Sequence, residues 1–253
     1  MIYKIGDTIA VQDHSLRVLS AAKNGDRLVV ELQVRNSGTA PLAVSSLLSF
    51  SARTTNGEPL GYPAGSGPLT EGRVQPGAEV KGTLTFRLSA NVEGLKLYYL
   101  PSLFASGVFV VALDEAAVSN PLPKPAEAEG ARAFAKGSSY KVGDAVVLKN
   151  VTARLISAEI TQNVVTARVV VYNGGARNLT VASIFSFGVT DSSGVKGTGK
   201  PVTDAPLLDG RLLPRDSLRG TVQWTFAAPP KGVRLTYADS TLFGEDQIVW
   251  KLD

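Results

Sequence analysis

Hydrophobic and polar residues alternate along much of this chain with a period of two. In residues 27–35 the apolar positions are Leu28, Val30, Leu32 and Val34, and mostly polar residues stand between them. Successive side chains of a strand point to opposite faces, so this segment predicts a strand with one buried face. Residues 164–172 repeat the same alternation. We therefore expect two equivalent strands, one in each half of the chain.

The correspondence extends beyond these strands, because the chain contains one pattern twice. Tyr-Lys-Ile-Gly-Asp at residues 3–7 returns as Tyr-Lys-Val-Gly-Asp at residues 140–144. Strand-ending asparagines, turn glycines, a Gly-Thr strand and a closing Leu-Asp pair follow in the same order in both halves. A repeat of this length is too long for a solenoid unit, so each copy is expected to have its own hydrophobic core.

Turn residues separate the alternating segments. Asn56-Gly57 and Ser193-Gly194 predict matched hairpin turns. The segments 36–38 and 173–175 are Asn-Ser-Gly and Asn-Gly-Gly, which we expect to supply positive φ angles for a tight reversal. Arg215 stands where the first copy has Gly77, so that turn is expected to differ or to be stabilised in another way. Many short strands without a helical period indicate an antiparallel β-sandwich in each copy.

The repeat also predicts the domain boundaries. The first copy covers residues 1–114 and the second covers residues 140–253, while the linker at residues 115–139 has no counterpart. Three prolines between residues 121 and 125 predict an extended, stiff first half of this linker. Residues 126–136 are expected to form a helical turn or two, and Phe134 is the residue able to dock the linker on a domain.

Composition limits the function classes. The 26 basic and 22 acidic residues give a net charge of +4, and the basic residues are scattered singly. Nucleic-acid-binding proteins usually cluster them with aromatic residues, so no nucleic-acid partner is expected. The absence of cysteine excludes disulfides, thiolate metal sites and a cysteine nucleophile. No segment approaches the roughly 18 consecutive apolar residues of a membrane-spanning helix. We expect no cofactor and no metal.

Few residues are candidates for catalysis. His14 is the only histidine, and the second copy has Val151 in its place. We interpret His14 as a surface residue of the turn at residues 12–15 rather than as a member of a catalytic triad. Asp7 and Asp144 follow the repeated glycines, and we expect each carboxylate to accept hydrogen bonds from backbone amides.

Loop carboxylates are the remaining candidates for chemistry. Asp204 with Asp209 forms one cluster, and Asp239 with Glu245 and Asp246 forms another. Neither cluster has the dense ligand spacing of a calcium loop, so we interpret both as solvated. A hydrolase that uses such carboxylates stays a third alternative for the function.

A binding candidate follows the strand at residues 95–99. The segment at residues 98–104 begins with Tyr-Tyr-Leu-Pro, whereas its counterpart at residues 237–243 begins with the more polar Tyr-Ala-Asp-Ser. Large apolar residues that only one copy carries are candidates for an interface. We therefore predict that Tyr98, Leu100 and Pro101 contact a partner.

The repeated motifs resemble a known family. The Tyr-Lys-(Ile/Val)-Gly-Asp opening, the strand ending in Val-x-Asn-x-Gly, the Gly-Thr-Leu-x-Phe strand and the Gly-Leu-Lys-Leu-x-Tyr segment carry the resemblance, in that order. They are similar to the bacterial immunoglobulin-like domains of unknown function in secreted antigens and surface lipoproteins. The resemblance implies an all-β chain of two tandem antiparallel Ig-like β-sandwiches joined by a Pro/Ala-rich linker. It implies no enzymatic activity and no catalytic motif.

The expected function follows from these observations. We expect a non-enzymatic, extracytoplasmic binding or structural module of the bacterial cell envelope that acts through loop and edge-strand surfaces. Its partner would be a protein or another cell-envelope component. No leader precedes the first predicted strand, so a cytoplasmic location and a structural role in a virion or other assembly stay open as alternatives.

Overall fold

The computed structural model describes residues 2–61, 64–66, 72–88, 92–101, 107–119, 125–200, 202, 208–238 and 246–252. The chain divides into two compact units. The first comprises Met1–Thr55 and Pro59–Pro121, and the second comprises Asn56–Glu58 and Leu122–Asp253. Each unit has its own strand order and its own core.

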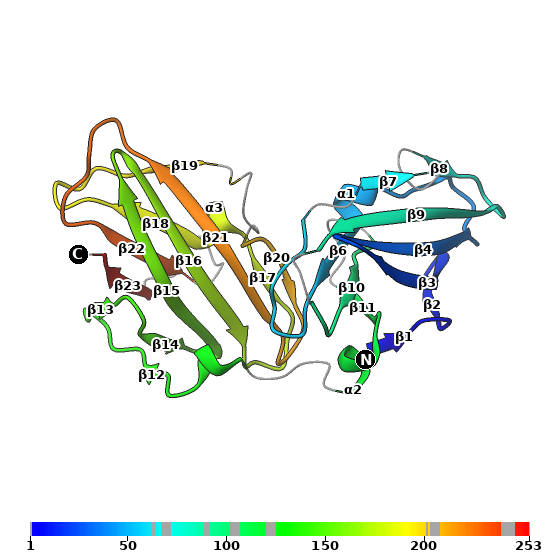
Figure 1. The fold of residues 1–253 in the computed structure, drawn as a ribbon, viewed down its shortest axis with the longest axis horizontal. Coiled ribbons are helices and arrows are strands. Elements are labelled where there is room, and N and C mark those ends of the chain that lie inside the picture. Colours follow the sequence, from blue (N-terminus) through cyan, green and yellow to red (C-terminus); the bar gives the residue numbers. More distant parts are fainter. Residues whose placement is uncertain are drawn as a thin grey trace. The chain divides into compact units, whose positions relative to one another are not determined.

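The first unit is a β-sandwich of two main sheets (Figure 1). One sheet has the order β2-β3-β4-β9-β7, the other has the order β1-β11-β10-β6, and β5 pairs with β8. The core lies between the two main sheets and takes side chains from both. The elements are β1 (Ile2–Lys4), β2 (Thr8–Val11), β3 (His14–Asn24), β4 (Arg27–Asn36), β5 (Leu42–Ala43), α1 (Ser46–Ser49), β6 (Phe50–Arg53), β7 (Ala64–Ser66), β8 (Arg73–Val74), β9 (Glu79–Arg87), β10 (Lys96–Tyr99), β11 (Phe109–Ala112) and α2 (Glu115–Ser119).

The second unit repeats this strand order with one addition. Its main sheets have the orders β12-β14-β15-β16-β21-β19 and β13-β23-β22-β18, and β17 pairs with β20. The additional strand is β12, which comes from the linker. The elements are η1 (Ala126–Ala128), β12 (Arg132–Ala133), β13 (Tyr140–Lys141), β14 (Ala145–Leu148), β15 (Val151–Thr161), β16 (Val164–Asn173), β17 (Leu179–Val181), α3 (Ser183–Ser186), β18 (Phe187–Thr190), β19 (Thr198–Lys200), β20 (Gly210–Leu212), β21 (Ser217–Thr225), β22 (Arg234–Ala238) and β23 (Gln247–Lys251).

The predicted fold class is confirmed, and the antiparallel pairing has three exceptions among the described strands. β1 pairs in parallel with β11, β13 with β23, and β12 with β14. The long hairpins β3–β4 and β15–β16 are antiparallel, and each contains a bulge at the same place, before Ser20 and before Ser157. A bulge increases the local twist of a strand, so both sandwiches share this bend.

The period-two alternation predicted the inward faces correctly. Leu28, Val30, Leu32 and Val34 on β4 are all buried, as are the matched residues on β16. On β21 Trp224 occupies the core position that Phe86 occupies on β9. These alternations are reliable because one face of each strand packs on a core while the other faces away from it.

The expectation about the strand-ending asparagines needs correction. Gly57 and Gly194 have the positive φ of the predicted hairpin turns, but neither the 36–38 nor the 173–175 segment contains a residue with positive φ. Gly38 is instead favoured by space, because a Cβ there would make a tight contact of 3.0 Å with the Cβ of Asp13. These asparagines act through their side chains, as described below.

Arg215 keeps the conformation of the glycine that it replaces. Its φ is 68° and that of Gly77 is 75°. Arg215 N donates to Asn173 O at 2.7 Å, and Gly77 N donates to Asn36 O at 2.9 Å. The turn is therefore the same in both units, and the hydrogen bond stabilises a left-handed conformation that is unfavourable for a residue with a Cβ.

The linker differs from its prediction in the second half. The short 3₁₀ helical turn η1 meets the expectation of a helical turn, while the two-residue strand β12 takes the place of a further one. β12 pairs with β14, which supplies partners for backbone groups that a helix would otherwise satisfy internally. Phe134 packs against the core of the second unit, which confirms its predicted docking. Pro121 and Pro123 lie outside the described residues, while Pro125 is extended, with φ −68° and ψ 144°.

Candidate functional site

His14 is buried, so its interpretation as a surface residue was wrong. Only 3% of the residue is exposed. It is the first residue of β3 and lies on the same strand face as Leu16 and Val18, which are also buried. The matched Val151 is buried as well. The alternation His14-Leu16-Val18 indicates an inward position for His14. This signal was missed because the residues next to His14 are typical of a turn.

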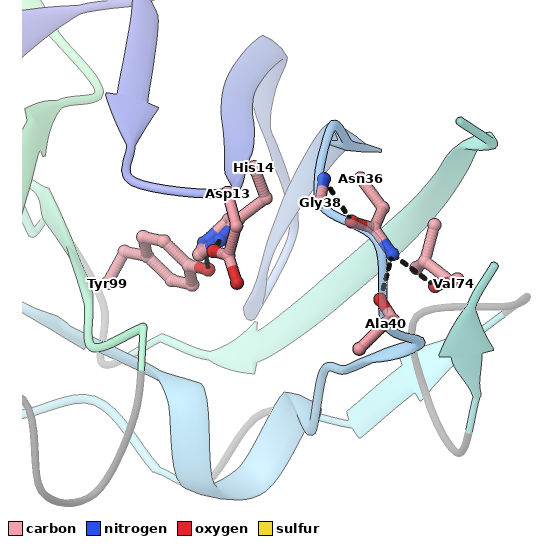
Figure 2. Close-up of polar contacts among 7 residues, drawn as sticks. All are labelled: Asp13, His14, Asn36, Gly38, Ala40, Val74 and Tyr99. Carbon is pink, nitrogen blue, oxygen red and sulfur yellow. Dashed lines mark hydrogen bonds and ion pairs between the residues drawn. The ribbon is translucent and has the colours of Figure 1, made fainter. Parts of the chain in front are cut away.

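The imidazole joins two other polar groups in the first unit. Its Nδ1 lies 2.8 Å from Asp13 Oδ1 and its Nε2 lies 2.6 Å from the Tyr99 hydroxyl (Figure 2). An ionised carboxylate only accepts hydrogen bonds, so Nδ1 carries the proton that Asp13 accepts. In the neutral imidazole Nε2 is then the acceptor for the Tyr99 hydroxyl. Three residues from two separate strands and a turn thus form one hydrogen-bonded chain.

Asp13 and Tyr99, at the two ends of this series of hydrogen bonds, differ in exposure and in the direction of their pKa shifts. Asp13 has a side chain that is 61% exposed, and its hydrogen bond to His14 lowers the pKa of the carboxyl below its ordinary value of 3.8. Tyr99 is 1% exposed, and burial raises the pKa of its hydroxyl far above its ordinary value of 10.0. Tyr99 therefore stays protonated over the physiological range and remains a hydrogen-bond donor.

Aromatic packing holds the tyrosine in place. Its ring stacks on Phe50 with centroids 5.1 Å apart, and His14 meets its edge at 5.9 Å and 89°. Edge-to-face and offset stacking are the favourable geometries for such rings. Because the hydroxyl is enclosed and already bonded, a substrate cannot reach it. The Asp13-His14-Tyr99 chain therefore stabilises the fold rather than activating a nucleophile.

A second buried polar element lies beside this chain and occurs in both units. Asn36 Nδ2 donates to the carbonyl oxygens of Ala40 and Val74, both at 2.8 Å, while its Oδ1 accepts from Gly38 N at 2.9 Å (Figure 2). Asn173 makes the matched contacts to Arg177 O at 2.8 Å and from Gly175 N at 3.0 Å. Each side chain satisfies backbone groups of the loop that follows its strand, and Asn36 also bonds a carbonyl at the end of β8.

The predicted contact residues differ in accessibility. Tyr98 is fully buried, and the Arg53 guanidinium lies 4.0 Å from its ring centroid. Leu100 and Pro101 are half-buried, and Leu100 N donates to Ser49 O at 2.8 Å. An incoming partner can touch Leu100 and Pro101 without a rearrangement, whereas Tyr98 is enclosed. The binding role of these three residues stays a prediction.

Some candidate carboxylates have structural roles, Asp246 is half-buried, and the others lie in the undescribed part of the chain. Asp7 Oδ2 accepts from Lys4 N at 2.8 Å, and Asp144 Oδ2 accepts from Lys141 N at 2.9 Å, as predicted for the repeated Gly-Asp pair. Asp209 accepts from the backbone N and the hydroxyl of Ser183 at the start of α3. Asp204, Asp239 and Glu245 lie outside the described residues.

Two searches within the described residues are negative. No group of three or more His, Asp or Glu side chains there has a geometry that could hold a metal ion. None of the described helices is long and apolar enough to span a membrane.

A known protein family matches this chain, and the match lies in the first unit. Residues 2–109 match the family described as "Domain of unknown function (DUF4352)". Because this match spans less than half of the chain, it says what the first unit is similar to. None of the curated proteins compared with the chain matches it.

Several solved structures are similar to part of the chain. The yjhA protein of Bacillus subtilis is 20% identical, with 45% of this chain and 100% of that chain covered and a TM-score of 0.38. An uncharacterized β-sandwich protein of Clostridium difficile is 9% identical, with coverages of 45% and 95% and a TM-score of 0.34. A secreted protein of Mycobacterium tuberculosis is 11% identical, with coverages of 47% and 99% and a TM-score of 0.37. The sandwich fold of the present chain follows from its own strand order.

Proposed function

We propose that this chain is a non-enzymatic binding or structural module of the bacterial cell envelope and that it acts outside the cytoplasm. The observation that carries the proposal is that several of its reactive side chains form hydrogen bonds within the fold. The only histidine bonds Asp13 and the buried Tyr99, and Asp209 bonds Ser183. These groups, which an enzyme could present to a substrate, are engaged within the fold, and this supports binding through surfaces as the function.

The proposal includes two copies of one domain, at residues 1–114 and 140–253, joined by the linker at residues 115–139. Its support is the repeated sequence together with the matched strand order, bulges and asparagine contacts of the two units. The resemblance to domains of secreted antigens and surface lipoproteins supports the extracytoplasmic location. A chain without cysteine also suits an oxidising compartment, because it cannot form wrong disulfides.

Loop and edge-strand surfaces are the proposed contact regions. Leu100 and Pro101 form one candidate. Phe185 on α3 forms another, because 66% of this aromatic residue is exposed. An exposed aromatic side chain supplies much apolar area at little cost in conformational entropy, and such residues are frequent anchors at interfaces. The partner is a protein or another envelope component.

The location can be tested in the bacterium that encodes the chain. The protein is expressed from its own gene start with a carboxyl-terminal tag, and intact cells are treated with protease. The proposal expects tagged protein in the medium, or tag loss from intact cells under conditions that leave a cytosolic control protein untouched. Full protection together with release only on cell lysis would contradict it.

The binding surfaces can be tested with matched variants. Leu100→Asp and Phe185→Asp place a charge on a candidate surface, and Lys231→Asp places one on an exposed turn elsewhere. Each tagged variant is cross-linked in intact cells. The proposal expects a cross-linked species that Lys231→Asp retains and that Leu100→Asp or Phe185→Asp reduces. Equal yields from all three variants would exclude these two surfaces.

A further inference from the structure

The linker covers one sheet edge of the second unit through five contacts. Arg132 and Ala133 pair in parallel with Val146 and Val147 of β14. Phe134 N donates to Val147 O at 2.9 Å, and its side chain packs on the core. The remaining two contacts are an ion pair of Arg132 with Asp144 at 3.8 Å and a hydrogen bond from Ala135 N to the Tyr140 hydroxyl at 2.9 Å.

Covered and uncovered edges differ in burial at matched positions. In the second unit Tyr140 is 7% exposed, Ala145 7% and Leu148 2%. The matched residues of the first unit are less buried, with Tyr3 and Val11 half-buried and Thr8 exposed. β2 is the end strand of its sheet within the described part of the first unit, where no segment takes the place of β12.

All the groups that receive the linker have counterparts on the first unit. Ile9 and Ala10 correspond to Val146 and Val147, Asp7 to Asp144 and Tyr3 to Tyr140. In a strand, the N–H and C=O of one residue point to the same side, so Val147 presents both groups to the linker. Ala10 occupies the same register against β3 as Val147 does against β15 and presents both groups at the sheet edge. Unpaired edge groups of this kind are a template for an added strand.

We propose that the β2 edge binds an extended segment of a partner protein that pairs in parallel with β2. The segment carries a basic residue, a small residue and an aromatic residue in succession, as Arg132, Ala133 and Phe134 do. The basic residue meets Asp7, the backbone pairs with Ile9 and Ala10, and the aromatic ring packs at the core rim beside Tyr3. The inference deepens the proposed binding function and rests on it.

A separate partner suits this edge better than a second copy of the chain. If a second copy donated its own linker, β14 of that copy would lose the same hydrogen bonds and the same aromatic contact. The exchange would form no additional contacts and would cost the entropy of association. A partner segment that is extended and uncovered beforehand has no such loss.

The test uses a peptide with the linker sequence at residues 131–136, Ala-Arg-Ala-Phe-Ala-Lys, blocked at both ends. It is titrated into the full isotope-labelled chain and followed by amide chemical shifts. A segment this short is expected to bind with a dissociation constant on the order of 1 mM. The expected shifts are confined to residues 3–11 and their neighbours on β3. The peptide with alanine in place of phenylalanine should bind at least about tenfold more weakly, because it lacks the main apolar contact.

Two chain variants isolate the backbone contact. Ala10→Pro removes the edge N–H but no ladder hydrogen bond to β3, and proline is tolerated on edge strands. Ala10→Val keeps the N–H and favours the strand. Ala10→Val should bind the peptide and Ala10→Pro should not, with equal melting temperatures showing that both are folded. If Ala10→Pro does not fold, Asp7→Asn replaces it and should weaken binding about twofold to fivefold through loss of the ion pair.

A tethered version overcomes weak affinity. A second copy of residues 131–139 is inserted directly before Tyr3, at the spacing that the linker has from Tyr140. The expected result is at least about tenfold slower hydrogen exchange at the Ala10 amide, lost when the added phenylalanine is changed to alanine. Unchanged β2 shifts with the peptide and unchanged exchange in the tethered chain would overturn the proposal. Self-association that protects Ala10 without peptide would also overturn it in favour of a second copy.

These results are separable from the proposed function. A cytoplasmic location in intact cells would refute the envelope role whether or not the peptide binds. Conversely, an envelope location with no peptide binding would agree with the envelope role and would exclude β2 as the contact surface.

Discussion

Replacement of His14 by valine, the residue of the second unit at this position, tests whether the Asp13-His14-Tyr99 chain is one cooperative element. The substitution removes both hydrogen bonds of the imidazole and leaves the buried Tyr99 hydroxyl without its acceptor. A lost hydrogen bond costs about 1 kcal/mol, and an unsatisfied buried polar group costs about 1–3 kcal/mol. We expect His14→Val to destabilise the first unit by about 2–3 kcal/mol.

The double variant, His14→Val with Tyr99→Phe, tests whether the two residues are energetically coupled. Tyr99→Phe alone leaves the His14 Nε2 unsatisfied and should cost about 1–2 kcal/mol. With both changes no buried group is left unpaired, so the double variant should be less destabilised than the sum of the single variants, by at least about 1 kcal/mol.

Urea unfolding of the full chain provides the assay. Both tryptophans, Trp224 and Trp250, lie in the second unit, so their fluorescence follows that unit alone and serves as the internal control. Near-ultraviolet circular dichroism reports both units, because the tyrosines are divided between them, so the first unit is followed as the transition that the tryptophan fluorescence does not show. Only that transition should move. If the two single costs add to the double cost within about 0.3 kcal/mol, the residues are uncoupled and the reasoning fails.

Two further predictions concern pH and turn glycines. The pKa of the Asp13 carboxyl is lowered in the folded state, so the stabilisation by its ionised form is present above the unfolded pKa and is lost as the pH falls through the folded pKa. The difference in melting temperature between the parent and Asp13→Asn should therefore shrink between pH 7 and pH 2. A constant difference would contradict this. Arg215→Gly should stabilise the second unit by about 0.5–1 kcal/mol, because glycine adopts the φ of 68° at this position without strain. Gly77→Arg should destabilise the first unit by a similar amount. If urea titrations gave changes in unfolding free energy of the opposite signs, the left-handed turn would be misassigned.

Much of the fold could be predicted from sequence, because one-sided burial leaves a period-two pattern. The strands around Val30 and Val169 and the turns at Gly57 and Gly194 were identified in this way. His14 was misread because a turn residue and a first strand residue look alike when the boundary is uncertain by one position. The roles of Asn36 and Asn173 were also missed, since some of their bonding partners, Val74 and Leu213, come near only after folding.

The sequence by itself determined that the chain contains two similar β-sandwiches, since a repeated alternation and repeated turn residues are local and need no knowledge of distant contacts. Only the tertiary structure decided which polar residues are buried together and which sheet edges are covered. Asp13, His14 and Tyr99 meet across 85 residues of chain, and the linker strand reaches β14 rather than forming a helix. Such pairings depend on the free energy of satisfying buried polar groups and unpaired strand edges, which becomes defined only when the sheets have assembled.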